Sequence, residues 1–525
     1  MIAINRRNLR IINGSACNTR QAKILACLFF TIVWLLLVFL FFEGICGTDD
    51  FKHLRFAYFW DHYPQNHWEA RLIYNSLLRL SLVAFGFNEI AAAIPTILGS
   101  YLLFVAILII AWNSTKDIQN VWVAGILGSS LPVIVLCTTP NARPLATGFF
   151  SIAFVVLLFL KNKKSVFLGG SILGIAVATH LSLLFCVVIA LLALPIAGAN
   201  TWKNCLIAFI AMLISFTLAD LLIYGLWTGD PLYRFHVINS THMITLDSDP
   251  NAREILRNDG NLNIMFFLRP IRDLLFSKLF ALLLGLATVS SVLNWRRLTL
   301  QNRALLFYLC LAWIWQSYGS QSPTAYKPFP GTTPYWGGLI LPAVVLATEV
   351  LCLLKQKAWM IIIVTFLITV NIAVLSLSGP WGQSVDMSQE LLSQINIETD
   401  VAFVSDDTTI NQLVVINGFS RPPNLFRTPV SERNAAVNVP KLDKNAFAAN
   451  QIKLMVNRLN FKNPPDNSEI WVRTHYGKEV YHGHPVYRLL TYLLPESFRR
   501  NHSWTVRRPA VKIYTVDKLP EVETL

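Results

Sequence analysis

The sequence predicts a mainly α-helical, polytopic membrane protein of about eleven spans with a C-terminal α/β domain. Hydrophobic residues make up 54% of the chain and charged residues 14%, and the mean hydropathy is +0.48. Apolar runs long enough to cross a bilayer recur from residue 24 to residue 379. After residue 380 this pattern ends, and short strand-like segments such as VAFVSDD and EIWVRTHY alternate with polar turns.

The N-terminal segment 1–23 contains basic residues but no acidic residue. Its basic residues are Arg6, Arg7, Arg10, Arg20 and Lys23. Cytoplasmic flanks of membrane helices carry such an excess, so this segment is predicted to be cytoplasmic. The apolar run that follows, about 24–42, is too long for the core of a signal peptide and lacks an A-x-A site after it. It therefore predicts an uncleaved anchor.

The later apolar runs predict the remaining spans. They lie at about 90–112, 121–138, 145–160, 165–199, 205–227, 273–294, 304–320, 336–354 and 359–379. The run 165–199 fits either one overlong helix or two short spans, and the polar break at Thr179, His180 and Ser182 favours two. With two spans, the short basic clusters between runs all fall on the cytoplasmic side.

This topology divides the chain into a cytoplasmic N-terminus (1–23), a transmembrane domain (24–379) and a soluble extracytoplasmic domain (380–525). Residues 44–88 form the first outer loop. The formal net charge is +14, but the basic residues sit in small clusters between apolar runs, as cytoplasmic loops require. We expect membrane lipids as partners, and no nucleic acid.

The first outer loop collects ionisable side chains among aromatic ones. Adjacent carboxylates at Asp49 and Asp50 suit a general base or a metal ligand. The alternative is structural, because Thr48 or Asp49 can cap a helix that begins near Phe51. Such a helix would bring His53 to the face of the acidic pair, where it could orient a carboxylate, whereas a solvated surface histidine is the other interpretation.

Four basic residues in the outer loops are candidates for binding a phosphate: Arg71, Arg143, Arg234 and Lys327. Arginine can bind phosphate through two parallel hydrogen bonds, and lysine acts as a point charge. Each also has a structural interpretation, as a headgroup-facing arginine, a turn residue or a charge that keeps a loop soluble. His180, within a long apolar run, is interpreted chiefly as the turn between two spans.

The order of these residues resembles the first outer loop of the GT-C glycosyltransferase superfamily, as found in protein O-mannosyltransferases and bacterial aminoarabinose transferases. The matching residues are Asp49, Asp50, His53, Asp61 and His62. The segments ARPLA (142–146), GGSILGIAVATH (169–180), TGDPLYRFH (228–236) and KPFPGTTPYW (327–336), followed by LILPAVV, also resemble recurring stretches of bacterial members. Two features depart from the family's pattern: Asp-Asp stands where mannosyltransferases have Asp-Glu, and His180 stands where several relatives carry a lysine. The absence of a WWD tripeptide argues against an oligosaccharyltransferase subunit.

The resemblance implies an enzyme of the bacterial inner membrane that moves a monosaccharide from a polyprenyl-phosphate donor to a hydroxyl of a glycan, lipid or protein. It implies inverting displacement at the outer face, with Asp49 or Asp50 as base. The donor phosphate would meet Arg71, Arg143, Arg234 and Lys327. The acceptor would be oriented by His53, Asp61 and His62. No organic cofactor is implied, and the need for a divalent metal is left open.

Two other classes share some of these features. A transporter or flippase should carry ionisable residues in mid-span and show internal symmetry. Only His180 and Asp220 come near the middle or outer half of a span, and no repeat is evident. A ligase or polymerase of lipid-linked saccharides would share the architecture. The sequence favours the transferase.

Overall fold

A computed structural model describes residues 6–42, 44–45, 48–114, 118–135, 138–242, 279–319, 337–354 and 356–378. In the C-terminal part it describes residues 401–404, 414, 425–427, 452–457, 478–479 and 511–516. The first group of residues is mainly helical and the second contributes strands. The mainly α class predicted from the sequence is confirmed for the part of the chain that is described.

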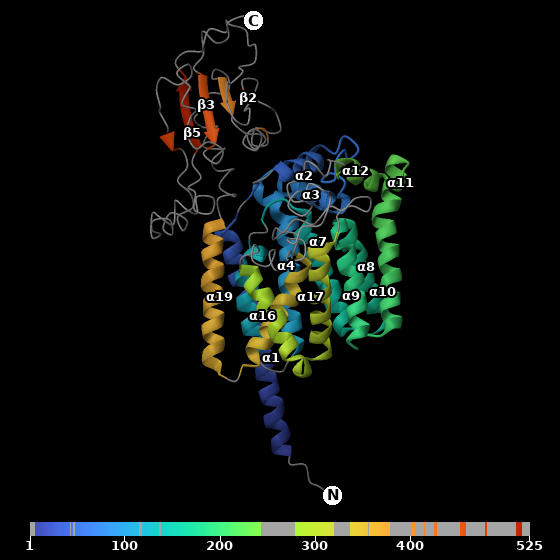
Figure 1. Ribbon diagram of the computed structural model, residues 1–525, viewed down its shortest axis with the longest axis vertical. Helices are drawn as coiled ribbons and strands as arrows, with labels where there is room; N and C mark the ends of the chain where they lie inside the picture. The colour runs from blue at the N-terminus through green and yellow to red at the C-terminus, as the bar shows by residue number, and fades with distance from the viewer. Residues whose placement is uncertain are drawn as a thin grey trace, which may run out of the picture.

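The long helices run side by side along the length of the molecule (Figure 1). They are α1 (Arg6–Leu40), α4 (Glu89–Ser114), α5 (Ile118–Ser130), α7 (Ala142–Phe159), α8 (Lys163–Thr179), α9 (Leu184–Ile196), α10 (Trp202–Phe216), α11 (Ile223–Thr228), α16 (Leu279–Leu293), α17 (Leu300–Tyr318), α18 (Gly337–Cys352) and α19 (Lys357–Ser378), with the short α6 (Pro132–Val135). One end of this bundle carries α2 (Thr48–Phe59), α3 (Leu72–Phe85) and α12 (Tyr233–His242). We call it the α2 end.

The composition of the helices is that of a multi-pass membrane bundle. Among the described residues, four helical stretches are long and apolar enough to cross a membrane: Arg20–Leu40, Glu89–Asn113, Ala142–Phe159 and Trp202–Thr228. Shorter apolar helices pack beside them. Large apolar side chains such as Phe39, Leu226 and Leu293 are exposed, which suits contact with lipid. The count of about eleven spans remains a prediction.

The apolar run 165–199 is divided at His180, as the polar break predicts. Helix α8 ends at Thr179, His180 is extended with φ −151° and ψ 108°, and a short 3-10 turn, η1 (Leu181–Leu183), precedes α9. Helix α8 packs against α7 and α10, and α9 packs against α17. The turn between α8 and α9 therefore lies among several helices.

Small residues let α8 approach α10 closely. A Cβ atom at Gly170 would overlap the carbonyl oxygen of Ala208, and one at Gly174 would lie 2.5 Å from the carbonyl oxygen of Met212. Glycines four residues apart form one face of a helix, and in membrane proteins such a face allows backbone-to-backbone packing. This contact fixes α8, whose last turn leads to His180.

A similar contact joins α4 and α7. A Cβ atom at Gly99 would overlap the backbone of Pro144 and Leu145, and one at Gly148 would overlap the carbonyl oxygen of Gly99. The first turn of α7, directly after Arg143, is therefore pressed against α4 without intervening side chains.

The described strands of the C-terminal part form one five-stranded sheet in the order β2-β1-β3-β5-β4. The strands are β1 (Val401–Val404), β2 (Leu425–Arg427), β3 (Ile452–Asn457), β4 (Lys478–Glu479) and β5 (Val511–Val516). Strand β1 is parallel to β2 and β3, whereas β5 is antiparallel to β3 and β4. The strands lie beyond the α2 end (Figure 1). Of the helical part of the predicted α/β domain, the structure describes residue 414 alone.

Candidate active site

Helix α2 presents its acidic and histidine side chains to α3. Asp50, His53, Leu54 and Ala57 are buried, and their spacing places them on one helical face. Helix α2 packs on α3 through this face. The backbone of Asp49 belongs to α2, but its side chain lies outside the described part of the structure. Asp50 is thus the member of the acidic pair whose position is known.

His53 is held in a defined tautomer by Asn75 of α3 and by Arg71, the residue before α3. Its Nδ1 lies 2.8 Å from Oδ1 of Asn75, and its Nε2 lies 3.2 Å from Nη1 of Arg71. Arginine only donates, so Nε2 accepts and Nδ1 carries the proton. The Asn75 amide nitrogen donates to the carbonyl oxygens of Trp68 and Glu69, which turns its oxygen toward His53. Burial and the charge of Arg71 lower the pKa of His53 to about 3.

Arg71 and Asp50 share one neighbour, Tyr74. Both charges act electrostatically on the buried Tyr74 hydroxyl, in opposite senses. Arg71 immediately precedes α3 and is 8% exposed, and Asp50 is 6% exposed. The candidate base and the first candidate phosphate ligand therefore both lie close enough to Tyr74 for their charges to act on its hydroxyl.

A chain of hydrogen bonds connects Tyr74 to the start of α7. The hydroxyl of Thr96 donates to the carbonyl oxygen of Asn141 at 3.3 Å and accepts from the backbone N–H of Asn141 at 3.2 Å. Since its only proton is used, the Tyr74 hydroxyl, 3.3 Å away, must donate to it. The Asn141 side chain in turn caps α7 by accepting from the backbone N–H of Arg143. The acid-bearing loop and Arg143 are thereby linked through α4.

Arg143 is paired with His180. Its Nε donates to Nε2 of His180 at 3.2 Å, so Nδ1 carries the ring proton and donates to the hydroxyl oxygen of Ser182, 2.7 Å away. Burial, followed by the charges of Arg71, Arg143 and Arg234, lowers the pKa of His180. His180 lies in the turn between α8 and α9. Three arginines from separate segments thus act on this one imidazole.

Arg234 is buried in an ion pair. Its Nη1 donates to Oδ1 of Asp220 at 2.9 Å and to the carbonyl oxygen of Ala178 at 2.6 Å. Both charged side chains are 2% exposed. Asp220 belongs to a π-helical turn, η2 (Thr217–Leu222), between α10 and α11, and such turns often occur at functional positions. The sequence suggests Arg234 as a phosphate ligand, but the structure places its guanidinium against Asp220 and the end of α8.

Two tyrosines from this region hold the loop before Arg71. The hydroxyl of Tyr224 donates to the carbonyl oxygen of Ala70, and that of Tyr233 donates to the carbonyl oxygen of Pro64, both at 3.0 Å. Helices α11 and α12 therefore fix the backbone that leads into Arg71.

Asp61 and His62 lie at the solvent-facing side of the same loop. Nδ1 of His62 lies 2.5 Å from Asp61, and its Nε2 lies 3.4 Å from Glu69. The hydrogen bond from His62 lowers the pKa of Asp61. Glu69, which also accepts from the backbone N–H of Gln65, joins this group two residues before Arg71. The pair therefore stands at the rim, and Asp50 stands in the interior.

Lys327 lies outside the described residues. No three His, Cys, Asp or Glu side chains come together as metal ligands in the part of the chain that the structure describes.

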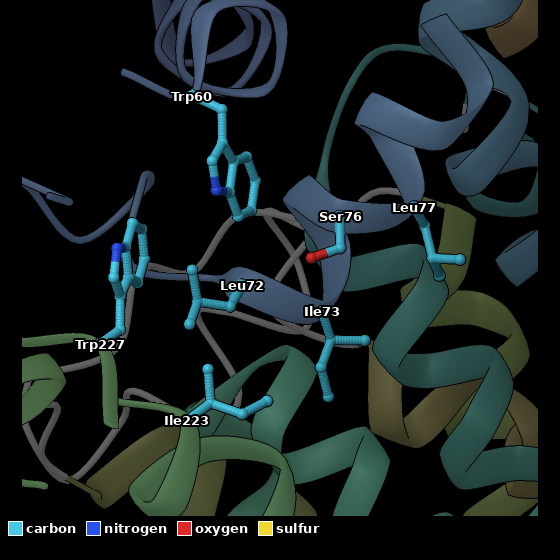
Figure 2. A pocket seen from close by; sticks show the side chains of 7 residues that line it. All are labelled: Trp60, Leu72, Ile73, Ser76, Leu77, Ile223 and Trp227. Carbon is cyan, nitrogen blue, oxygen red and sulfur yellow. The ribbon is translucent and has the colours of Figure 1, made fainter. Parts of the chain in front are cut away.

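An apolar cavity begins one residue beyond Arg71 (Figure 2). Its volume is about 510 Å³. It is lined by Trp60, Leu72, Ile73, Ser76, Leu77, Ile223 and Trp227. Ser76 supplies the one hydroxyl in this lining, and the other side chains are apolar or indole. The cavity lies between α3 and α11, which are the helices adjoining the Arg71 loop.

Trp60 forms the wall of this cavity in a strained backbone conformation. Its φ is 49°, a left-handed value that bulky residues rarely adopt. Its ring stacks on Trp227 with centroids 5.9 Å apart and planes 7° from parallel. Arg79 lies over the ring of Trp60 and donates to two carbonyl oxygens at the end of α2. The strained backbone of Trp60 thus lies in the wall of the cavity that adjoins Arg71.

Several site residues are absent from the sequence-based set. They are Glu69, Tyr74, Asn75, Thr96 and Asp220. Asn75 and Asp220 carry a sequence signal, because each is a strongly polar residue within an otherwise apolar stretch. Tyr74 and Thr96 carry none, since tyrosine and threonine are ordinary in such stretches.

The chain has the fold of ArnT from Cupriavidus metallidurans. Against ArnT bound to undecaprenyl phosphate the TM-score is 0.51 with 12% sequence identity, and the match covers 93% of this chain and 97% of that chain. ArnT in the apo state gives a TM-score of 0.50 with the same identity and coverage. The archaeal oligosaccharyltransferase AglB from Archaeoglobus fulgidus, in complex with an inhibitory peptide and a dolichol-phosphate, gives 0.40 at 9% identity, over 84% of this chain and 69% of that chain.

No family model and no curated protein sequence matches the chain. The match to ArnT nevertheless confirms, at the level of the fold, the resemblance to GT-C membrane glycosyltransferases predicted from the outer-loop residues.

Proposed function

We propose that the protein is a glycosyltransferase that moves a monosaccharide from a polyprenyl-phosphate donor to a hydroxyl of a glycan, lipid or protein. The observation that carries this proposal is that Arg143 donates to His180, that the charges of Arg71 and Arg143 both act on this histidine, and that Arg71 and the buried Asp50 both act on Tyr74. Two arginines can bind a phosphate and stabilise its developing charge. The fold supports the proposal, since ArnT has been described with undecaprenyl phosphate bound.

In the proposed reaction, Asp50 accepts the proton of the acceptor hydroxyl while the hydroxyl oxygen attacks the anomeric carbon. The bond from that carbon to the phosphate oxygen breaks, its electron pair stays on the phosphate, and the anomeric configuration inverts. Arg71 and Arg143 meet the charge that develops on the phosphate. Asp49 remains the alternative base, Asp61 and His62 are proposed to orient the acceptor at the rim, and Lys327 is proposed as a further cation.

The apolar cavity suits the isoprenoid chain of the donor. It starts at Leu72, next to Arg71, so a lipid whose phosphate reached Arg71 would have its first isoprene units beside this cavity (Figure 2). Apolar and aromatic linings with few polar groups are typical of such sites.

The proposed orientation follows the distribution of basic residues. The N-terminus would be cytoplasmic, and the α2 end with the C-terminal domain would face outward from a bacterial inner membrane, in a topology of about eleven spans.

The decisive experiment incubates the purified protein in nanodiscs with a panel of polyprenyl-phosphate monosaccharides and measures release of the polyprenyl phosphate. Loss of one sugar lipid, with formation of a glycosylated acceptor, is the expected result. Consumption of none of them, together with movement of the lipid between leaflets of a vesicle, would instead establish a flippase. Polyprenyl-diphosphate oligosaccharides are tested beside this panel, because their preferential use would establish the ligase or polymerase alternative.

A further inference from the structure

The same arrangement of arginine and histidine occurs twice at the α2 end. In both pairs an arginine N–H donates to Nε2 of a histidine at 3.2 Å, from Arg71 to His53 and from Arg143 to His180. In both, Nδ1 then donates to an uncharged side-chain oxygen, Oδ1 of Asn75 or Oγ of Ser182. The two pairs share no residue and come from different helices.

Each imidazole is neutral in this arrangement. A protonated ring would turn Nε2 into a donor facing a guanidinium, so the observed hydrogen bonds exclude it. The charged groups that act on His53 are Arg71 and Lys52, and both are cationic.

The surroundings of His180 have the same character. The groups that act on it are Arg71, Arg143, Arg234 and the second imidazole His67. His53 is 1% exposed and His180 is 8% exposed, so water does not screen these charges effectively.

We propose that His53 and His180 are positioning residues that aim Arg71 and Arg143 at the donor phosphate without adding negative charge of their own. A carboxylate in either position would hold the guanidinium equally well, but it would repel the phosphate and compete with it for the same N–H groups. A neutral imidazole orients the guanidinium without repelling the phosphate. This inference rests on the proposed function, and it gives His53 a role toward the donor instead of the acceptor.

The test measures the dissociation constant of undecaprenyl phosphate for the protein in nanodiscs, with Gln, Leu and Glu in turn at position 180 and at position 53. His180→Gln retains an acceptor for the Arg143 N–H, so affinity stays within about 1.5-fold of the unmodified protein. His180→Leu removes the acceptor and weakens binding about tenfold. His180→Glu keeps an acceptor but adds a carboxylate, so it weakens binding most, about a hundredfold. The order at position 53 is the same.

His236→Glu is the matched control. This histidine is 67% exposed and hydrogen-bonded to Asp230, and the substitution adds the same charge near the same end without touching an arginine of the site. Its affinity should match that of the unmodified protein. A general electrostatic effect would instead weaken it as much as His180→Glu does.

A mild second variant covers the case in which the His180 variants do not fold. Ser182→Ala removes only the oxygen that accepts from Nδ1, and a freed ring should weaken undecaprenyl phosphate binding about threefold. Unchanged affinity in Ser182→Ala would overturn the assignment for His180.

The binding measurements distinguish a failure of the proposed function from a failure of the role inferred for the two histidines. Absence of undecaprenyl phosphate binding by the unmodified protein would overturn the proposed function and this inference together. Binding by the unmodified protein, with the Gln and Glu variants equally affected, would overturn the inference alone, because a purely structural histidine does not distinguish a neutral acceptor from a charged one.

Discussion

Asp220 and Arg234 form a buried ion pair, with Oδ1 and Nη1 2.9 Å apart. The same nitrogen donates to the carbonyl oxygen of Ala178, two residues before His180. The pair therefore connects the π-helical turn and α12 to the end of α8. It thereby fixes the turn after α8, where His180 accepts a hydrogen bond from Arg143.

Removing one member of this pair should be costly, and removing both should cost less. Asp220→Asn leaves a buried guanidinium without its counter-charge, and we expect a loss of roughly 3 kcal/mol of unfolding free energy. The double variant Asp220→Asn, Arg234→Gln should lose less than the sum of the single variants. Thermal unfolding in detergent provides the measurement. Additive losses would show that the two side chains act independently.

Asp50→Asn should abolish transfer while the protein remains folded. The amide has the same shape but cannot accept the acceptor's proton, so turnover should fall at least about a hundredfold. Turnover and the midpoint of thermal unfolding are measured on the same preparation. Asp230→Asn, at a half-exposed carboxylate of the same end, serves as the control. Near-normal transfer by Asp50→Asn would remove Asp50 as the base.

Arg143→Ala should impair use of the donor more than use of the acceptor. Loss of a charged contact to phosphate should raise the donor KM about tenfold or more, while the acceptor KM stays within about twofold. Arg55→Ala, at an exposed position of α2, is the matched control. Equal changes in both KM values would indicate a structural role for Arg143.

Acid should destabilise the protein through His53. The pKa of His53 is about 3 in the folded protein and 6.5 in a model peptide, so the unfolded chain binds the extra proton below pH 6.5. Stability is fully present above that value and is lost as pH falls toward 3. Between pH 7 and pH 5 the loss attributable to this group is about 2 kcal/mol. His53→Gln should remove that part of the pH dependence. Parallel pH curves for the two proteins would contradict the depressed pKa.

Filling the apolar cavity should discriminate donors by chain length. Ser76→Phe places a ring in the space between Trp60 and Ile223, and we expect the KM of a long-chain donor to rise about tenfold. The KM of a donor with a single isoprene unit should rise much less, since only that one unit would lie beside the cavity. An equal rise for both donors would place the chain elsewhere.

The membrane helices could be predicted closely from the sequence. The apolar run at about 90–112 corresponds to Glu89–Ser114, and the run at 145–160 corresponds to Ala142–Phe159. Burial in lipid requires an unbroken apolar stretch of defined length, so the signal is local and strong. The division of the run 165–199 at His180 followed from the same reasoning.

The sequence indicated several residues of the site, but it did not indicate which of them contact each other. Arg143 and His180 were each notable in the sequence, yet their contact depends on how α7 packs against the turn between α8 and α9. Likewise Asp220 stood out in an apolar run, but periodicity does not reveal that Arg234 is its partner. Hydrogen bonds through Thr96 arise only once α3, α4 and α7 are packed together.

The contact of α4 with α7 at Gly99 and Gly148 limits which substitutions the chain tolerates beside Arg143. Directly after Arg143, these two helices meet through peptide groups, so there is no side chain at that point whose exchange could alter the shape of the site. A larger side chain at Gly99 or Gly148 would therefore have to push α4 and α7 apart, and so would shift Arg143 relative to His180.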